Sequence, residues 1–336
     1  MNNKIPTFMA GALFLCFAFA NFSFATELPQ IRGVAVHVID KPDDQIAMLD
    51  ISQKMGFDSV RDEARWRLVE KVKGKYEIPP AWDQFVNQAL ARNLQPLLIL
   101  AWSNPLYDGG DKPRSKEAID GFVKYASFVV QHFKGRVRHY EIWNEWDTKM
   151  GSVTEGSPED YAKLFQAVYP ALKKVDPSAI IIAGAGTKQT PWIEGMARFG
   201  VVKLADGIAM HPYVYWKPGK SGDADFYIST LKYFNAKAVS LSGRSNVNFY
   251  ITEIGWPSYI GKYGRTEDEV AQFAANTFRL SAKLPFVRGV WWYDLKNDGQ
   301  DPQNMEHNFG LIEADNTPKP AADAVKMVLR QIKQGD

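Results

Sequence analysis

Residues 137–146, Val-Arg-His-Tyr-Glu-Ile-Trp-Asn-Glu-Trp, form a short β-rich run that ends in polar side chains. A helical pattern precedes this run over residues 116–132, and another follows it over residues 158–175. A strand with an amphipathic helix on either side is typical of a parallel sheet whose strands are joined by crossover helices. The number of such units along the chain therefore decides the fold.

The same alternation extends from residue 31 to the last helical pattern of the sequence. The predicted strands are residues 31–38, 59–63, 96–101, 137–143, 179–183, 207–210, 248–254 and 289–293. The predicted helices are residues 44–55, 82–92, 116–132, 158–175, 192–199, 224–238, 267–282 and 319–334. Eight strands alternating with eight helices predict a single (β/α)₈ barrel, the TIM barrel, over residues 26–336. A doubly wound open sheet is the alternative, but no Gly-rich phosphate-binding loop follows the first strand, as a dinucleotide-binding fold requires.

The first 25 residues have the pattern of a secretory signal peptide. Lys4 supplies a positive charge, residues 8–19 an apolar segment, and Ser23-Phe24-Ala25 a cleavage site with small residues at its first and third positions. We expect cleavage after Ala25, with an uncleaved N-terminal anchor as the alternative. The single cysteine, Cys16, lies in this segment, so the mature chain is expected to contain no thiol. These features predict a periplasmic or secreted protein.

Composition argues against several kinds of partner. The formal net charge of the sequence is +2, and basic residues alternate with acidic ones without a long run of Lys and Arg. A nucleic-acid-binding surface needs such a basic stripe, so no nucleic-acid partner is expected. We expect no membrane span in the mature protein and a monomeric state. Aromatic residues make up 13% of the chain, which suits either a large core or surfaces that stack on sugar rings.

Two glutamates close predicted strands at the barrel edge where active sites of this fold lie. Glu145 follows the fourth strand, which must break near Asn144 to present both side chains at the mouth. Glu253 ends the apolar seventh strand, where a carboxylate is costly unless it is paired or functional. Either glutamate alone is more often a salt-bridge partner than a catalytic group.

Together, the two carboxyl groups fit glycoside hydrolysis. In that reaction one carboxyl group protonates the leaving oxygen, while the other attacks the anomeric carbon or activates a water molecule. A separation of ~5 Å gives retention of configuration, and ~6.5–9.5 Å gives inversion. The residues alone leave these two routes open.

Trp143-Asn144-Glu145 on the fourth strand and Thr252-Glu253 on the seventh resemble glycoside hydrolase clan A, whose barrels carry their catalytic glutamates on these strands. The resemblance covers residues 26–336. It implies a retaining β-glycosidase with Glu145 as the acid/base and Glu253 as the nucleophile.

Two further residues resemble positions of the clan. Arg61, on the second strand, is similar to the arginine that pairs with the nucleophile and would keep Glu253 ionised. A peripheral ion pair with Asp62 or Glu63 is the alternative for this arginine. Asn144 is expected to hydrogen-bond the sugar 2-hydroxyl, a contact that strengthens in the transition state.

His211 and Tyr213, after the sixth strand, resemble a His-x-Tyr pair that lines the clan's active site. His211 would brace the acid/base, and Tyr213 would donate its hydroxyl to Glu253. An isolated histidine is more often a core residue, and no second histidine or thiolate stands at ligand spacing. We therefore expect no metal and no cofactor.

Aromatic residues near the strand ends are candidate sugar platforms. Strand alternation gives Trp292 a different facing from its neighbours, and we expect it to form the platform of the −1 subsite. Trp102 and Trp256 are expected to bind more distant sugars. About half of the aromatic residues at the mouth should instead pack in the core; the full set is Trp66, Trp102, Tyr107, Trp146, Tyr215, Trp216 and Trp256.

Within the clan, residues 291–299, 308–311 and 319–321 most resemble family 39, with family 5 close behind. The chain resembles short exported bacterial members found beside exopolysaccharide genes, and we expect no β-sandwich of the kind that many family 39 xylosidases carry. This favours endo action on a polysaccharide, either an exopolysaccharide or a β-glycan, over an exo-acting β-xylosidase or β-glucosidase. A non-catalytic carbohydrate-binding barrel is the alternative from another class. A metal-dependent deacetylase would need clustered His and Asp ligands, and the sequence shows no such cluster.

Overall fold

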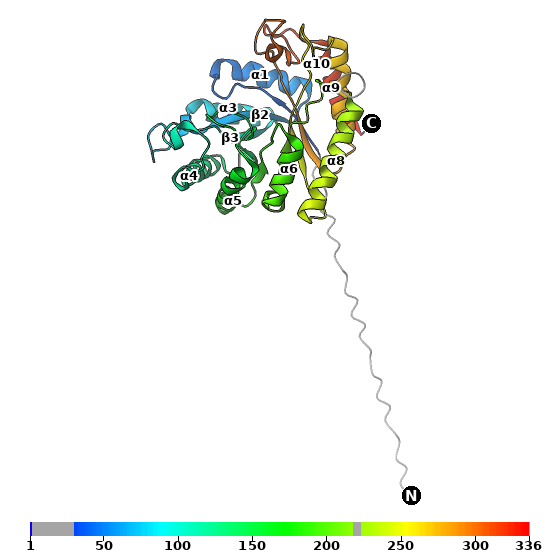
Figure 1. The fold of residues 1–336 in the computed structure, drawn as a ribbon. Helices are drawn as coiled ribbons and strands as arrows, with labels where there is room; N and C mark the ends of the chain where they lie inside the picture. Colours follow the sequence, from blue (N-terminus) through cyan, green and yellow to red (C-terminus); the bar gives the residue numbers. More distant parts are fainter. Residues whose placement is uncertain (2–29, 218–222, 336) are drawn as a thin grey trace.

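The computed structural model describes Met1 and residues 30–217 and 223–335. In this part of the chain, eight parallel strands pair in sequence order and close into a barrel in which β8 pairs with β1 (Figure 1). The predicted (β/α)₈ barrel is confirmed. The strands are β1 (Ile31–Ala35), β2 (Ser59–Arg65), β3 (Gln95–Ala101), β4 (His139–Ile142), β5 (Ile180–Ala183), β6 (Gly207–Met210), β7 (Phe249–Ile254) and β8 (Val287–Trp292). The predicted signal peptide lies, apart from Met1, outside the described residues.

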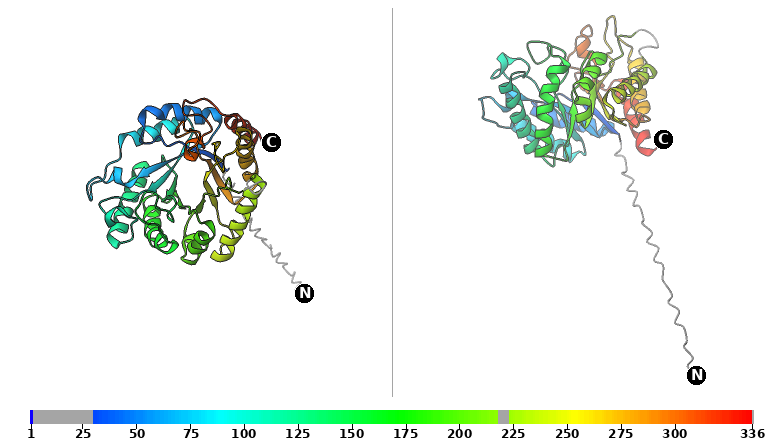
Figure 2. Two further views of the ribbon diagram at one scale, coloured as in Figure 1. Left: turned by 45° about the horizontal axis from the view of Figure 1, so that its top comes forward. Right: turned by 60° about the horizontal axis from the view of Figure 1, so that its bottom comes forward.

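Helices form a ring around the barrel (Figure 2). All eight predicted helices are present with ends shifted by a few residues: α1 (Pro42–Met55), α3 (Pro80–Ala91), α4 (Lys116–Phe133), α5 (Pro158–Val175), α6 (Gln189–Arg198), α8 (Ala224–Ser242), α9 (Glu267–Ser281) and α10 (Pro320–Gln334). Two short helices, α2 (Trp66–Val69) and α7 (Val201–Leu204), were not predicted. They are each four residues long, which is too short for a helical period to stand out in a sequence.

Each strand is buried on both faces, as the β3 side chains illustrate. Leu97 and Ile99 point into the barrel interior, while Leu98 and Leu100 pack in the layer between the barrel and the helices. Parallel sheets with both faces covered favour such continuous apolar runs over a polar alternation. The helices present their apolar faces to the same outer layer, so the hydrophobic core is a shell around the barrel.

Trp291 and Tyr250 fill part of the barrel interior. The indole Nε1 of Trp291 donates a hydrogen bond to Ser59 Oγ at 2.9 Å. Glycines make room for this ring, because a Cβ atom at Gly33 or Gly289 would lie 2.1 or 2.4 Å from it. The barrel is thus a packed core and not a pore.

A left-handed turn follows β4. The strand ends at Ile142, and the next residues include Trp143 with φ +66° and Glu145 with φ +48°. Side chains make this backbone region costly, and such strain is typically kept at functional sites. The predicted strand break is therefore present, and it brings Asn144 and Glu145 to the barrel mouth.

A β-bulge interrupts β7 just before its end. Ile251 pairs with Val290 and Ile254 pairs with Trp292, so three steps along β7 match two along β8. Bulges of this kind redirect a side chain next to an active site. Because of the extra residue, two consecutive side chains of β7 reach the same group of residues: Glu253 contacts Arg61, and Thr252 contacts Glu141.

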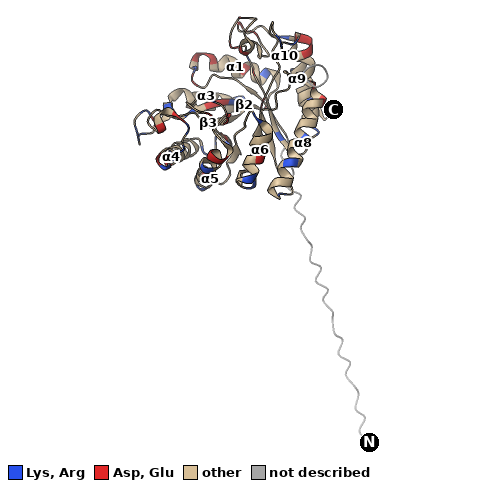
Figure 3. Cartoon of the chain, viewed as in Figure 1, with Lys and Arg blue, Asp and Glu red and all other residues tan. Residues whose placement is uncertain are grey.

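Acidic and basic residues are interspersed over the helices that surround the barrel (Figure 3). Among the described residues, no helix is both long and apolar enough to cross a membrane.

The Gly184 position gives a test of how tightly the β4 turn is held. A Cβ atom at Gly184 would lie 2.4 Å from the carbonyl oxygen of Ile142 and 2.5 Å from that of Trp143. Backbone cannot yield as a flexible side chain does, so we expect Gly184→Ala to lower the free energy of unfolding by about 1–3 kcal/mol in urea denaturation. Gly243→Ala, with a φ of +69° and open space around it, is the control and should cost about 1 kcal/mol. Equal stability of Gly184→Ala and the wild type would contradict the tight packing.

Candidate active site

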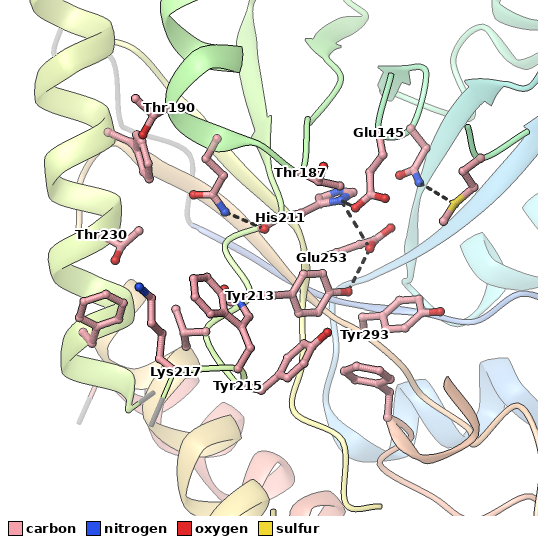
Figure 4. A pocket seen from close by; sticks show the side chains of 18 of the residues that line it. Glu145, Thr187, Thr190, His211, Tyr213, Tyr215, Lys217, Thr230, Glu253 and Tyr293 are labelled. Atoms are coloured by element: carbon pink, nitrogen blue, oxygen red, sulfur yellow. Dashed lines mark hydrogen bonds and ion pairs between the residues drawn. The ribbon is translucent and has the colours of Figure 1, made fainter. Parts of the chain in front are cut away.

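A cavity of about 800 Å³ opens at the carboxyl ends of the strands. The cavity is lined by Asn144, Glu145, His211, Tyr213 and Glu253, which come from β7 and from the turns after β4 and β6. These are five of the nine residues predicted from sequence to form the site. Figure 4 shows Glu145, His211 and Glu253 facing one another. Ligand sites commonly occupy cavities of ~300–1,000 Å³ with a few convergent polar groups, so this is the candidate active site.

Arg61 lies beneath this cavity with only 2% of the residue exposed. Its Nη1 donates to Glu253 Oε1 at 2.8 Å, and its Nη2 donates to Asn144 Oδ1 at 2.8 Å. Glu141, fully buried on β4, accepts longer hydrogen bonds of 3.3 Å from the Nε and Nη2 atoms of the same guanidinium. Arg61 thus joins β2, β4 and β7, and its partner is the predicted nucleophile rather than Asp62 or Glu63.

Glu253 is surrounded by hydrogen-bond donors. Besides Arg61, the hydroxyl of Tyr213 donates to Glu253 Oε2 at 3.0 Å, and His211 Nδ1 lies 3.5 Å from the same oxygen. Burial opposes ionisation of Glu253, but His211, Arg61 and Tyr213 outweigh it and hold the pKa of Glu253 below its usual range. This carboxylate is therefore kept charged in the cavity.

Glu145 has a different environment. Its Oε1 lies 2.8 Å from His211 Nδ1, and the other ring nitrogen of His211 lies 3.1 Å from Thr252 Oγ1. Burial acts to lower the pKa of His211, but Glu253 and Glu145 together raise it. No arginine or lysine contacts Glu145 among the described residues, in contrast to Glu253.

Oxygen atoms of Glu145 and Glu253, together with a nitrogen of His211, lie within 4.8 Å of one another. This is the separation at which one carboxyl group can protonate a leaving group while the other attacks the same carbon directly. The two carboxyl groups are closer together than inversion through an intervening water molecule requires.

Glu145, His211 and Glu253 are also the described residues whose donor atoms could surround a metal ion, a grouping that sequence spacing did not reveal. Their lone pairs are already used: Glu253 accepts from Arg61 and Tyr213, and the imidazole contacts Glu145. A divalent cation would also meet the fixed positive charge of Arg61, 2.8 Å from Glu253. The donor set therefore fits a metal poorly.

A second titratable pair borders the cavity. His37 Nε2 lies 3.5 Å from Asp294 Oδ2, and Asp294 follows the cavity-lining residue Tyr293. Burial raises the pKa of Asp294 to about 7, although His37 opposes this shift. Asp294 thus changes its charge in the neutral pH range.

The expected role of Trp292 is wrong. The residue is fully buried and faces the outer layer, where its ring lies 6.0 Å from that of Phe273. Strand alternation correctly places Trp292 and its neighbours on opposite faces of β8, but it does not show which face points into the barrel interior. Its neighbour Tyr293 lines the cavity instead and lies edge-on to Tyr213.

Trp256 is also not a sugar platform. Its ring stacks on Phe273 with centroids 4.0 Å apart, the Arg265 guanidinium covers it at 4.9 Å, and only 6% of the residue is exposed. Trp102 is half-buried and outside the cavity lining, although its Nε1 donates to the cavity residue Glu63 at 2.9 Å. Of the aromatic residues expected at the mouth, the cavity is lined by Tyr215 and Trp216.

Sequence reasoning missed two buried residues of the site. Glu141 contacts Arg61, and Thr252 Oγ1 donates to Glu141 Oε1 at 3.3 Å and contacts His211. A signal for Glu141 was present, because strand alternation places it on the opposite face from the outward residues Tyr140 and Ile142. An acidic residue at an inward position of a barrel strand needs a cationic partner.

A (β/α)₈ barrel with two facing glutamates, one in the turn after β4 and one on β7, defines a clan A glycoside hydrolase. The sequence model of the cellulase family, glycosyl hydrolase family 5, matches residues 20–292. The chain belongs to this family. The predicted kinship is thus confirmed, with family 5 as the matching family and family 39 among similar structures.

Solved structures resemble the whole barrel. A family 39 glycoside hydrolase from Bacteroides cellulosilyticus is 30% identical, with a TM-score of 0.78, covering 91% of this chain and 64% of that one. A family 5 subfamily 18 protein from Streptomyces cattleya, in complex with GlcNAc, is 18% identical, with a TM-score of 0.75, covering 93% and 82%. The second likeness shows the fold alone.

A barley protein named as a glucan endo-1,3-β-glucosidase is 26% identical over 96 residues, which are 27% of this chain and 30% of the barley protein. The chain thus spans less than two thirds of the length of this relative and of the Bacteroides structure.

The raised pKa of Asp294 predicts a pH effect on stability. Between pH 3.8 and about 7, the folded protein keeps a proton on Asp294 that the unfolded chain loses, so this residue makes stability fall as pH rises. Asp294→Asn cannot titrate, so this fall should disappear, and the variant should gain up to a few kcal/mol relative to the wild type between pH 4.5 and 7.5. Urea unfolding across this range measures the difference.

Asp120→Asn, which changes an exposed aspartate on α4, is the matched control and should leave the slope of stability against pH as in the wild type. A slope that Asp294→Asn also leaves unchanged would contradict the assignment of the proton to Asp294.

Proposed function

We propose that this chain is a retaining β-glycosidase that cuts within a polysaccharide, with Glu145 as the acid/base and Glu253 as the nucleophile. The observation that carries the proposal is the pair of buried carboxyl groups with oxygen atoms within 4.8 Å of each other in a cavity at the barrel mouth. Membership of a glycoside hydrolase family supports the same class of reaction.

The surroundings of the two carboxyl groups support the division of roles. Arg61 and Tyr213 keep Glu253 charged and oriented, as a nucleophile requires. Glu145 has no arginine or lysine partner among the described residues. Its carboxyl group contacts the His211 imidazole, which can donate or accept a proton. A pair of carboxyl groups held in unlike environments is the pattern that acid and nucleophile need.

In the first step, Glu253 attacks the anomeric carbon while Glu145 gives its proton to the leaving oxygen, and a covalent glycosyl-enzyme forms. Asn144, oriented by Arg61, would hydrogen-bond the sugar 2-hydroxyl. In the second step Glu145 takes a proton from water, the water oxygen attacks the same carbon, and Glu253 leaves as the carboxylate that Arg61 and Tyr213 stabilise.

The extent of the cavity supports endo action. Its lining continues from the two glutamates along the segment after β6 to α8, where Trp216 and Tyr233 are about half exposed. Several aromatic faces along one groove distribute binding over several sugars of a polymer. The N-terminal signal pattern supports an exported protein, in the periplasm or secreted, that meets a bacterial exopolysaccharide or a β-glycan there.

Azide rescue tests the roles of the two glutamates. On an activated aryl β-glycoside, we expect Glu253→Gly and Glu145→Ala each to lower kcat at least on the order of 10³-fold. Azide should restore Glu253→Gly through an α-glycosyl azide, because it attacks from the side of the missing nucleophile. Azide should restore Glu145→Ala through a β-glycosyl azide, because it attacks the glycosyl-enzyme from the other side. Proton NMR identifies both products.

The reverse stereochemistry in the two variants would exchange the roles of the glutamates. Glu306→Gln, which changes another carboxyl group of the cavity lining, is the matched control and should form neither azide.

Endo action predicts a dependence on substrate length. Long oligosaccharides should be cut faster than aryl monosaccharides, because binding energy from remote subsites is used at the reacting centre. Trp216→Ala should impair long substrates more than short ones, whereas Trp102→Ala, outside the cavity lining, should not discriminate by length. The measurement is kcat/KM across a ladder of oligosaccharides.

An end-blocked polymer separates endo from exo action. An endo enzyme should lower the viscosity of such a polymer rapidly with little free monosaccharide. Monosaccharide release from the first minutes, abolished by end-blocking, would establish the exo-acting β-xylosidase or β-glucosidase alternative instead.

A further inference from the structure

The cavity has an extension that the catalytic chemistry does not use. We call it the α8 arm and define it by Trp216, Lys217, Phe226, Thr230 and Tyr233, which come from the segment after β6 and from α8. Figure 4 shows Lys217 and Thr230 facing the same space on the far side of Tyr213 from the two glutamates. A polymer bound over the glutamates would continue into this arm.

Lys217 is the cation of the arm. It is half-buried, and its Nζ lies 4.3 Å from the ring centroid of Trp216 and 5.8 Å from that of Phe226. Among the described residues, no carboxylate forms an ion pair with Lys217, whereas Lys237 on α8 pairs with Glu194 at 2.6 Å. The aromatic rings hold the ammonium group at the cavity wall without neutralising its charge, so this charge remains available to an anionic ligand in the cavity.

The backbone that carries Lys217 is fixed from behind. Arg265 Nη2 donates to the carbonyl oxygens of Tyr215 and Lys217, both at 2.9 Å, and Trp256 packs against the Arg265 guanidinium. Trp216 Nε1 in turn donates to the carbonyl oxygen of Tyr213 at 3.1 Å. The Lys217 backbone and the Trp216 ring are therefore positioned before a ligand arrives, which lowers the entropy cost of binding.

The charges of the cavity lining are asymmetric. Its acidic residues are Glu145 and Glu253 at the centre, with Glu63 and Glu306 among the other lining residues, while Lys217 is the lysine of the lining. A negatively charged sugar is repelled from the carboxylates and attracted to the arm. The hydroxyl group of Thr230 lines the same arm and suits the hydroxyls of a sugar ring.

We propose that the α8 arm is a subsite for a hexuronic acid, an acidic sugar unit of the polymer, whose carboxylate pairs with Lys217 while its ring packs against Trp216. This inference rests on the proposed function, since it names the substrate class of the same cleft. The positive charge of Lys217 in the arm and the carboxylates elsewhere in the cavity would also fix the register in which a polymer with regularly spaced acidic sugars binds.

The test compares methyl β-glucuronide with methyl β-glucoside, two probes that differ only in the carboxylate. Binding is measured by calorimetry and by tryptophan fluorescence in the Glu253→Gln background, so that no turnover is needed. We expect the glucuronide to bind about tenfold more tightly, as one charge-assisted hydrogen bond gives. The preference should be lost in Lys217→Met, retained in Lys217→Arg, and reduced by 0.5 M salt, a concentration on the order of those that screen ion pairs.

Lys262→Met, which removes a lysine outside the cavity lining, is the matched control and should keep the preference. Equal binding of the two probes, or a preference that survives in Lys217→Met, would overturn the assignment. Because binding is measured without hydrolysis, such a result leaves the proposed reaction standing, and a failed azide rescue leaves the subsite standing.

Discussion

Arg61 carries a positive charge in the interior of the barrel, where 2% of the residue is exposed, and other strands must balance that charge. A buried ion is tolerated only when its partners and hydrogen bonds are nearly complete, and removing one partner costs several kcal/mol. Glu253 from β7 and Glu141 from β4 supply the negative charges, and Asn144 supplies a further acceptor. One guanidinium thereby fixes the orientation of the groups that face the cavity.

The two glutamates of the site differ because the barrel delivers them differently. The β-bulge in β7 brings Glu253 onto Arg61 and Tyr213, so its carboxylate remains charged despite burial. The left-handed turn after β4 carries Glu145 past Arg61 to His211 instead. Each of these backbone irregularities would be unfavourable in an isolated segment, and the packing of the surrounding barrel stabilises it. The unlike environments of the two carboxyl groups thus follow from two local distortions of a regular barrel.

The sequence predicted the fold because eight apolar runs alternated with eight helical patterns, and because no Gly-rich phosphate-binding loop supported the doubly wound alternative. The pairing of Arg61 with Glu253 and of Tyr213 with Glu253 was predicted from the resemblance to clan A, because the residue types alone did not specify these partners. The prediction failed for Trp292, because strand alternation separates two faces without showing which one faces the barrel interior. It failed for Trp256, because an aromatic ring near a strand end can pack against a cation such as Arg265 instead of a sugar. The α8 arm was beyond prediction, since it depends on where a helix lies against a loop.

Trapping of the covalent intermediate tests the central claim most directly. The protein would be incubated with dinitrophenyl 2-deoxy-2-fluoro-β-glycosides of several sugars, and its peptides analysed by mass spectrometry. The account predicts that one of these sugars becomes attached to the peptide that contains Glu253, and that the label is absent when Glu253→Gln is treated in the same way. A label on Glu145, or hydrolysis of a fluorosugar that accumulates no covalent adduct and releases the inverted anomer, would contradict it.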